Sequence, residues 1–375
     1  MSIPDTPAHP GEAGLDRRRL IQVASMAAAA SGIASEAARA QQPEGVVAIA
    51  AAADYVRDPT RWGSPEVAAL FPGFQHLDMR TNGAVIRLRH GGSGAPLLLL
   101  HGNPQNHVCW HKVAARLAQR YHVVIPDLPS GGRLRGGGHW TRDIAFSLDG
   151  KKMYVSVGSH SNVDDTDNNP VEFHRADILE ANPDGTNLRV YAWGIRNAVG
   201  IAVHPQTGAL WASVNERDGL GDDVPPDYIT HVQENGFYGW PWYYIGGNQD
   251  PRHKGKHPEL KDKVLVPDVL IQPHNASLEM LFYEADQFPP EYRGSIFAAE
   301  HGSWNRNSRT GYEVIRVAMK DGRVTGEYED FLSGFVTSKG DVWGRPVGVA
   351  VAKDGSLLVS DDGSNCIWRV SYQGK

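Results

Sequence analysis

The chain has 375 residues, a formal net charge of −6, 41% hydrophobic residues, 41 glycines and 24 prolines. This composition is typical of a turn-rich globular protein of two or three domains and excludes a disordered chain. The mild acidity argues against broad nucleic-acid binding, because such proteins carry an excess of Lys and Arg.

The N-terminus combines a basic cluster with an alanine-rich run. Residues 17–19 are all arginine, residues 23–30 are weakly apolar, and residues 38–40 read Ala-Arg-Ala. We expect residues 1–40 to be a twin-arginine-type signal peptide that directs export to the periplasm. The alternative is a basic tail followed by a surface helix. The apolar run is too short to span a membrane.

Residues 41–130 have an α/β pattern. A strand is expected over residues 83–89, and the continuous apolar run over residues 96–100 predicts a strand buried on both faces. Residues 110–119 have helical periodicity, and residues 121–125 form a further apolar run. Strand, helix and strand in this order are typical of the opening of a doubly wound sheet.

This segment resembles the beginning of an α/β-hydrolase, and within that class the haloacetate dehalogenases. The resemblance rests on residues 71–74, on residues 97–105 with their His-Gly-Asn-Pro turn, and on residues 123–128. In that family the turn donates backbone N–H groups to the pocket. No nucleophile elbow follows residue 130. We therefore expect a truncated hydrolase fragment that cannot hydrolyse substrate by that mechanism.

Residues 131–138 contain five glycines and two arginines, which is typical of a flexible connector. We interpret the chain as a fusion of two gene fragments, whether natural or artefactual. The alternative is a genuine two-domain protein with a small α/β cap.

From residue 131 to residue 375 one pattern recurs: a short apolar strand, a tight turn and a second apolar strand. The turn glycines are Gly150, Gly208, Gly294 and Gly355, at spacings of 58, 86 and 61 residues. Repeated antiparallel hairpins at such intervals predict a β-propeller. Propellers carry their chemistry on loops at one end of a central channel.

The same region resembles the pyrroloquinoline quinone (PQQ) dependent sugar dehydrogenases, specifically the L-sorbosone dehydrogenase-like group related to soluble aldose dehydrogenases. The matching motifs occur in order at residues 138–142, 158–162, 193–197, 215–218, 238–241, 300–306 and 344–346. The resemblance implies a mainly β, six-bladed propeller. Residues 131–375 suffice for about four blades, so we expect a partial propeller that exposes edge strands.

The resemblance also implies a reaction, in which an aldose or sorbosone-type sugar is oxidised with PQQ as the hydride acceptor. His139 is the expected general base, because an imidazole near neutral pH suits proton removal. Arg196 is expected to stabilise charge that develops on the quinone oxygen, and Asn197 to hydrogen-bond the cofactor. The alternative for each is a packed or solvated loop residue.

Cofactor binding requires cations, because PQQ carries three carboxylates and guanidinium groups bind carboxylates bidentately. Arg345 matches a cofactor-binding arginine of the relatives, and Arg306 is a second candidate. His301 and Trp304 are expected to line the plane of the cofactor.

The resemblance further implies a calcium ion, which prefers oxygen ligands. The loop over residues 215–223 is the best match, with Glu216, Arg217 and Asp218 as its candidate metal-site residues. The alternative is a solvated acidic loop.

One departure from the family concerns the general base. Soluble aldose dehydrogenases have an Asp that orients the base where this chain has Gly158-Ser159. Ser159 or His160 would have to orient His139 here.

We therefore predict a periplasmic PQQ- and calcium-dependent sugar dehydrogenase that passes electrons to an external acceptor and is impaired by truncation. One alternative is a haloacetate dehalogenase-like hydrolase identity carried by the first third of the chain. The other is a non-catalytic propeller that binds a partner or a sugar.

Overall fold

The computed structural model describes residues 65–81, 84–101, 106–127, 138–139, 143–320 and 322–374. The chain divides into two compact units, Met1–Leu134 and Arg135–Lys375. The predicted signal peptide over residues 1–40 and residues 131–137 of the connector lie outside the described residues. Among the helices that are described, none combines the length and the apolar character needed to cross a bilayer.

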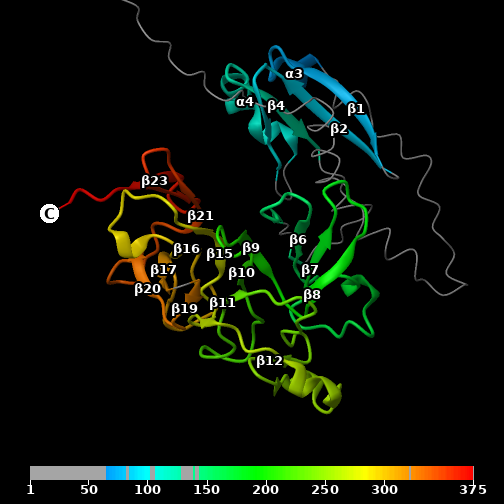
Figure 1. Ribbon diagram of the computed structural model, residues 1–375, viewed down its shortest axis with the longest axis vertical. Helices are drawn as coiled ribbons and strands as arrows, with labels where there is room; N and C mark the ends of the chain where they lie inside the picture. Colours follow the sequence, from blue (N-terminus) through cyan, green and yellow to red (C-terminus); the bar gives the residue numbers. More distant parts are fainter. Residues whose placement is uncertain are drawn as a thin grey trace, which may run out of the picture. The chain divides into compact units, whose positions relative to one another are not determined.

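The first unit is a small α/β unit (Figure 1). It contains a four-stranded sheet of order β1-β2-β4-β3. Its elements are α3 (Pro65–Ala69), β1 (Gln75–Thr81), β2 (Ala84–Gly91), β3 (Ala95–Leu98), the 3-10 helix η1 (His107–Trp110), α4 (His111–Leu117) and β4 (Tyr121–Pro126). β3 and β4 pair in parallel, whereas β1–β2 and β2–β4 are antiparallel. The expected strand–helix–parallel strand unit is thus confirmed.

Apolar side chains of β4 pack on both faces of this sheet. Val123 and Ile125 contact Ala114 of α4, while Val124 packs against Ile86 of β2 on the other face. The apolar run over residues 96–100 was expected to be buried on both faces, but its side chains are only half-buried. The reason is the position of β3 at the edge of the sheet.

The second unit consists of four antiparallel sheets that follow one another along the chain (Figure 1). The first sheet contains β5 (Ile144–Phe146), β6 (Met153–Val157), β7 (Asp177–Ala181) and β8 (Arg189–Trp193). The second contains β9 (Ala198–Val203), β10 (Leu210–Val214), β11 (Tyr228–His231) and β14 (Val269–Leu270).

The third sheet contains β15 (Ser277–Phe282), β16 (Ile296–Glu300), β17 (Glu313–Val317) and β20 (Glu329–Leu332). The fourth has three strands, β21 (Pro346–Val351), β22 (Leu357–Asp361) and β23 (Cys366–Val370). Two short pairs complete the unit, β12 (Tyr243–Tyr244) with β13 (Asn248–Gln249) and β18 (Met319–Lys320) with β19 (Arg323–Val324). The predicted mainly β character of this region is confirmed.

The four predicted hairpins are also confirmed. Each turn glycine lies between the first and second strands of one sheet, which pair antiparallel. Gly150, Gly208, Gly294 and Gly355 have φ values of 66°, 73°, 80° and 83°. A side chain disfavours this left-handed conformation, so glycine recurs at the turn of every copy.

Three apolar clusters join neighbouring sheets. Ile178 packs with Leu210 between the first and second sheets, and Trp211 packs with Met280 between the second and third. Between the third and fourth sheets lies a cluster around Phe297, Val314, Val349 and Val359. The first strands are neighbours too, because β9 lies against β5 and β15, and β15 lies against β21. The loops that precede these strands are therefore brought together.

A buried carboxyl group ends β16. Glu300 is 0% exposed, its Oε1 accepts a hydrogen bond from the Ser277 hydroxyl at 2.8 Å, and its Oε2 has no partner among the described residues. Burial, reinforced by the nearby Asp227 and Glu313, raises the pKa of Glu300 from 4.5 to about 8.

The Glu300→Gln substitution tests this pKa shift. The folded chain retains a proton that the unfolded chain releases between pH 4.5 and about 8. Glu300 therefore lowers the unfolding free energy as the pH rises through this window, by up to about 1.4 kcal/mol per pH unit. Because Gln cannot ionise, we expect urea unfolding to show the variant gaining stability relative to wild type between pH 5 and pH 8. If variant and wild type differed in unfolding free energy by the same amount at pH 5 and at pH 8, the pKa shift would be contradicted. The control is Glu327→Gln, because Glu327 is exposed.

Candidate functional site

The predicted site residues lie on loops at one end of the four sheets. His139, Arg196 with Asn197, and Arg345 precede the first strands β5, β9 and β21. Residues 216–218 and 301–306 follow the second strands β10 and β16. In an antiparallel hairpin the start of the first strand and the end of the second lie at the same end. The topology therefore gathers these loops around the first strands.

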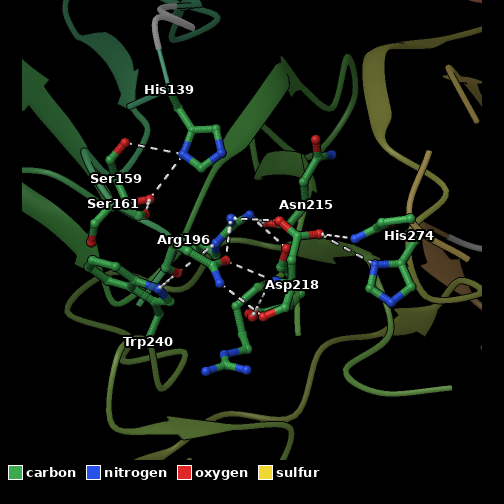
Figure 2. Close-up of polar contacts among 12 residues, drawn as sticks. His139, Ser159, Ser161, Arg196, Asn215, Asp218, Trp240 and His274 are labelled. Carbon is green, nitrogen blue, oxygen red and sulfur yellow. Dashed lines mark hydrogen bonds and ion pairs between the residues drawn. The ribbon is translucent and has the colours of Figure 1, made fainter. Parts of the chain in front are cut away.

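His139 precedes β5 and is hydrogen-bonded to Ser159, in the loop that follows β6 (Figure 2). Its backbone N–H donates to the Ser159 carbonyl at 2.9 Å, and its ring Nδ1 lies 2.9 Å from Ser159 Oγ and 3.1 Å from Ser159 O. Arg175 Nη2 donates to the carbonyl of His139 at 2.7 Å. Of the two residues expected to orient His139, the contact is made by Ser159. The buried Nδ1 of His160 has no hydrogen-bond partner within the described part of the chain.

Arg196 is buried, with 4% exposure, and its guanidinium is surrounded by acceptors. Its Nε donates to Asn162 O at 3.0 Å, its Nη1 to Glu216 O at 2.6 Å, and its Nη2 to Asn162 Oδ1 at 2.9 Å. Longer contacts join Nη1 to Asn215 O at 3.4 Å and Nη2 to Asp218 Oδ2 at 3.5 Å. Burial lowers the pKa of Arg196, opposed mainly by the charge of Asp218. The side chain thus ties together loops of the first and second sheets.

Asn197 lies next to His139 without a full set of partners. It is 3% exposed, and its Oδ1 has no partner among the described residues. Gly158 makes this proximity possible. A Cβ on Gly158 would lie 2.2 Å from Asn197 Oδ1 and 2.6 Å from His139 Cβ. The two residues of this pair have different effects. Ser159 contacts His139, and the absence of a side chain at Gly158 leaves room for Asn197.

We expect Gly158→Ala to displace His139 or Asn197 and to lower the unfolding free energy by about 1–3 kcal/mol, as overpacking of a close-packed site does. Urea unfolding measures this loss. Gly348→Ala is the matched control, because a Cβ there would meet only Ser360 Oγ, at 3.0 Å. Equal stabilities of the two alanine variants would contradict the close packing at Gly158.

Asp218 connects loops of three sheets (Figure 2). Its backbone N–H donates to Asn162 Oδ1 at 2.8 Å, and its Oδ1 accepts from Asn305 Nδ2 at 2.7 Å. His274 Nδ1 lies 3.5 Å from the same carboxylate oxygen. No role was predicted from the sequence for Asn162, His274 or Arg175. Only Asn162 carried a signal there, as the last residue of the motif at 158–162.

The three residues expected at a metal site do not direct their side chains to a common point. The Glu216 carboxylate accepts from the backbone N–H of Arg217 at 3.0 Å, and burial raises its pKa to about 7. Arg217 forms a buried ion pair with Asp250, with Nε and Oδ2 2.9 Å apart, while Asp218 makes the contacts described above. In the part of the chain that is described, no group of three or more His, Cys, Asp or Glu side chains is arranged to hold a metal.

The remaining candidates lie in two further groups, the first around Arg345 and His301 and the second around Arg306. Arg345 donates to His301 O at 3.1 Å and to Gly302 O at 3.0 Å, and His301 Nε2 lies 2.9 Å from Asp362 Oδ1. Trp304 is 76% exposed.

Arg306 belongs to the second of these groups. It contacts Gln272 Oε1 at 3.2 Å and Asp223 Oδ1 at 3.0 Å. Asn162 is a shared partner of Arg196 and Asp218, and Ser159, which contacts His139, donates its backbone N–H to Arg196 O at 2.7 Å. Among the hydrogen bonds of the described residues, none joins Arg345 or Arg306 directly to His139.

Comparison with known proteins identifies the class. The sequence model named Glucose / Sorbosone dehydrogenase matches residues 116–368, so the chain belongs to this family. The expected relationship to sugar dehydrogenases is thereby confirmed.

Two curated relatives match about two thirds of the chain. An uncharacterized protein of Borreliella burgdorferi is 34% identical over 238 residues, 63% of this chain and 61% of that protein. The aldose sugar dehydrogenase YliI of Escherichia coli is 29% identical over 269 residues, 67% of this chain and 64% of that protein. The chain thus spans less than two thirds of the length of either relative.

A solved structure supports the fold. The holo form of the pyranose dehydrogenase PQQ domain from Coprinopsis cinerea matches with a TM-score of 0.52 at 19% identity, covering 76% of this chain and 77% of that one. This likeness concerns the fold alone.

A further match is much shorter. A fluoroacetate dehalogenase of a Burkholderia species is 44% identical over 63 residues, 17% of this chain and 21% of that protein.

Proposed function

We propose that the second unit oxidises an aldose or sorbosone-type sugar with PQQ as hydride acceptor and His139 as general base. The observation that carries this proposal is the meeting of His139, Ser159, Arg196 and Asn197 where the loops of the first and second sheets join. Family membership supplies the reaction class. A sugar substrate and PQQ as cofactor are supported by the names of two relatives, the aldose sugar dehydrogenase of Escherichia coli and the pyranose dehydrogenase PQQ domain of Coprinopsis cinerea.

His139 is suited to the proton-transfer step. Its ring is held at Nδ1 by Ser159, and its backbone is fixed by Ser159 and Arg175. An imidazole that titrates near neutral pH can accept a proton from a sugar hydroxyl without extreme tuning. Fixing the ring also lowers the entropic cost of reaching the reactive geometry.

The same end of the sheets carries groups that suit a cofactor with three carboxylates. PQQ, when bound, supplies the quinone carbonyl that accepts a hydride. Arg345 offers a cation, and Asn197 offers a buried amide whose Oδ1, without a partner among the described residues, accepts a hydrogen bond only from an N–H or O–H group. Arg196 holds Asn215 O and Asp218 at its two longest contacts, 3.4 and 3.5 Å. These two N–H groups make the longest hydrogen bonds of Arg196. They are therefore the ones most easily donated to a ligand oxygen on which negative charge develops during the reaction.

The broader organisation is part of the same proposal. The four sheets form a partial propeller of the six-bladed type, and residues 41–130 are a truncated α/β-hydrolase-like segment. Residues 1–40 export the protein to the periplasm, where an external acceptor reoxidises the cofactor. A calcium role rests on the family resemblance, and the side chains of Glu216, Arg217 and Asp218 do not fit a calcium site.

Reconstitution tests the proposal against its two alternatives. Purified protein is incubated with PQQ and calcium, and dye reduction is followed on addition of aldoses. Sugar-dependent dye reduction that requires PQQ supports the proposal. Release of fluoride or chloride from haloacetates without dye reduction would replace it with the hydrolase function. Absence of both activities would leave a non-catalytic binding module.

A further inference from the structure

The ring of His139 faces two acceptors that belong to the same residue (Figure 2). Nδ1 lies 3.1 Å from Ser159 O and 2.9 Å from Ser159 Oγ. A carbonyl oxygen carries no proton and can only accept a hydrogen bond. Nδ1 must therefore carry the proton if it is to bond to Ser159 O.

The Ser159 hydroxyl leads to the same assignment independently. Its Oγ lies 2.6 Å from the carbonyl oxygen of Ser161, which again can only accept. The single hydroxyl proton is therefore donated to Ser161 O, and Oγ is left to accept from Nδ1. Because neutral imidazole carries one N–H, the lone pair then resides on Nε2.

We propose that Ser159 is a positioning residue that holds neutral His139 in the Nδ1–H tautomer, through a hydroxyl relay that ends at Ser161 O. The significance for catalysis rests on the proposed function, because a general base needs its lone pair on the nitrogen that meets the substrate. The wrong tautomer of a catalytic histidine cannot accept that proton. Ser159 sets the tautomer with a neutral acceptor and places no negative charge beside the ring.

The relay is itself held in place. Ser159 is 0% exposed, and its backbone N–H donates to Arg196 O at 2.7 Å. Ser161 N–H donates to the buried carboxylate of Glu172 at 2.6 Å. Arg175 Nη2 donates to Ser159 O at 3.1 Å. These bonds fix the positions of both acceptors, so the ring cannot turn over without losing two hydrogen bonds.

The test is 15N NMR of protein labelled at histidine, without cofactor and at a pH where the ring is neutral. His139→Gln identifies the His139 signals. We expect the wild-type ring to be protonated at Nδ1 and unprotonated at Nε2. Ser159→Ala retains the carbonyl but loses the hydroxyl, and is expected to lower the ratio of Nδ1–H to Nε2–H about three- to tenfold. Ser159→Thr keeps a hydroxyl and is expected to retain the wild-type ratio.

Two results would overturn the assignment. One is a wild-type ring protonated mainly at Nε2, which needs no variant to be seen. The other is an unchanged ratio in Ser159→Ala, once its thermal unfolding shows that it folds. The tautomer is measured without sugar or PQQ, so it can hold even if the protein reduces no dye. Conversely, if the wild type is active but Ser159→Ala has an unchanged ratio, the role of Ser159 is refuted while the proposed function stands.

Discussion

His139→Gln is expected to lower kcat for PQQ-dependent sugar oxidation by about 100-fold or more, the usual contribution of a positioned general base. Glutamine approximates the size of the imidazole but cannot take a proton at neutral pH. Binding of sugar and cofactor should change little, so KM stays near its wild-type value. Steady-state dye reduction by PQQ-loaded protein measures both constants.

The matched control is His231→Gln. His231 ends β11, at the opposite end of that strand from the candidate site, and its ring lies against Trp211. We expect this variant to keep the wild-type kcat. If His139→Gln and His231→Gln were equally active, another group would have to remove the proton, and His139 would lose its assigned role.

Arg196→Ala is expected to destabilise the second unit by about 3 kcal/mol, because it removes a buried guanidinium together with its three shortest hydrogen bonds. The carbonyls of Asn162 and Glu216 lose donors at 3.0 and 2.6 Å, and the Asn162 side chain loses one at 2.9 Å. Urea unfolding of wild type and variant gives the difference in free energy.

Arg369→Ala provides the comparison. Arg369 also pairs with a carboxylate, that of Asp354, but the two side chains are 60% and 48% exposed. Exposed pairs of this kind contribute about 0–1 kcal/mol. A loss at Arg196 no larger than the loss at Arg369 would show that the buried guanidinium does not hold the loops together.

Local sequence patterns predicted the elements well. The turn glycines, such as Gly150 and Gly355, require a left-handed backbone that few other residues tolerate, so they marked each hairpin. The apolar run and helical periodicity of residues 96–125 likewise predicted β3, α4 and β4. Both signals depend on neighbours close in sequence, which is why they could be interpreted without a structure.

Contacts between loops were harder to predict. The sequence left His160 as a second candidate beside Ser159 for orienting His139, because both follow β6 and only the turn of the loop distinguishes them. The acidic loop over residues 215–223 made Glu216 and Arg217 candidate metal-site residues, but nothing in the sequence indicated that Arg217 pairs with Asp250, 33 residues away. Such partners are set by how the loops at the ends of the strands fold against one another.

The most direct test of the central claim is the absorbance of PQQ bound to the protein during titration with an aldose in the absence of dye. The proposed function predicts that one equivalent of sugar removes the absorbance of one equivalent of bound quinone in wild type. In His139→Gln, PQQ should still bind, but its quinone absorbance should be lost far more slowly. Wild-type protein that binds PQQ yet keeps its quinone spectrum at saturating concentrations of each aldose tested would contradict the claim.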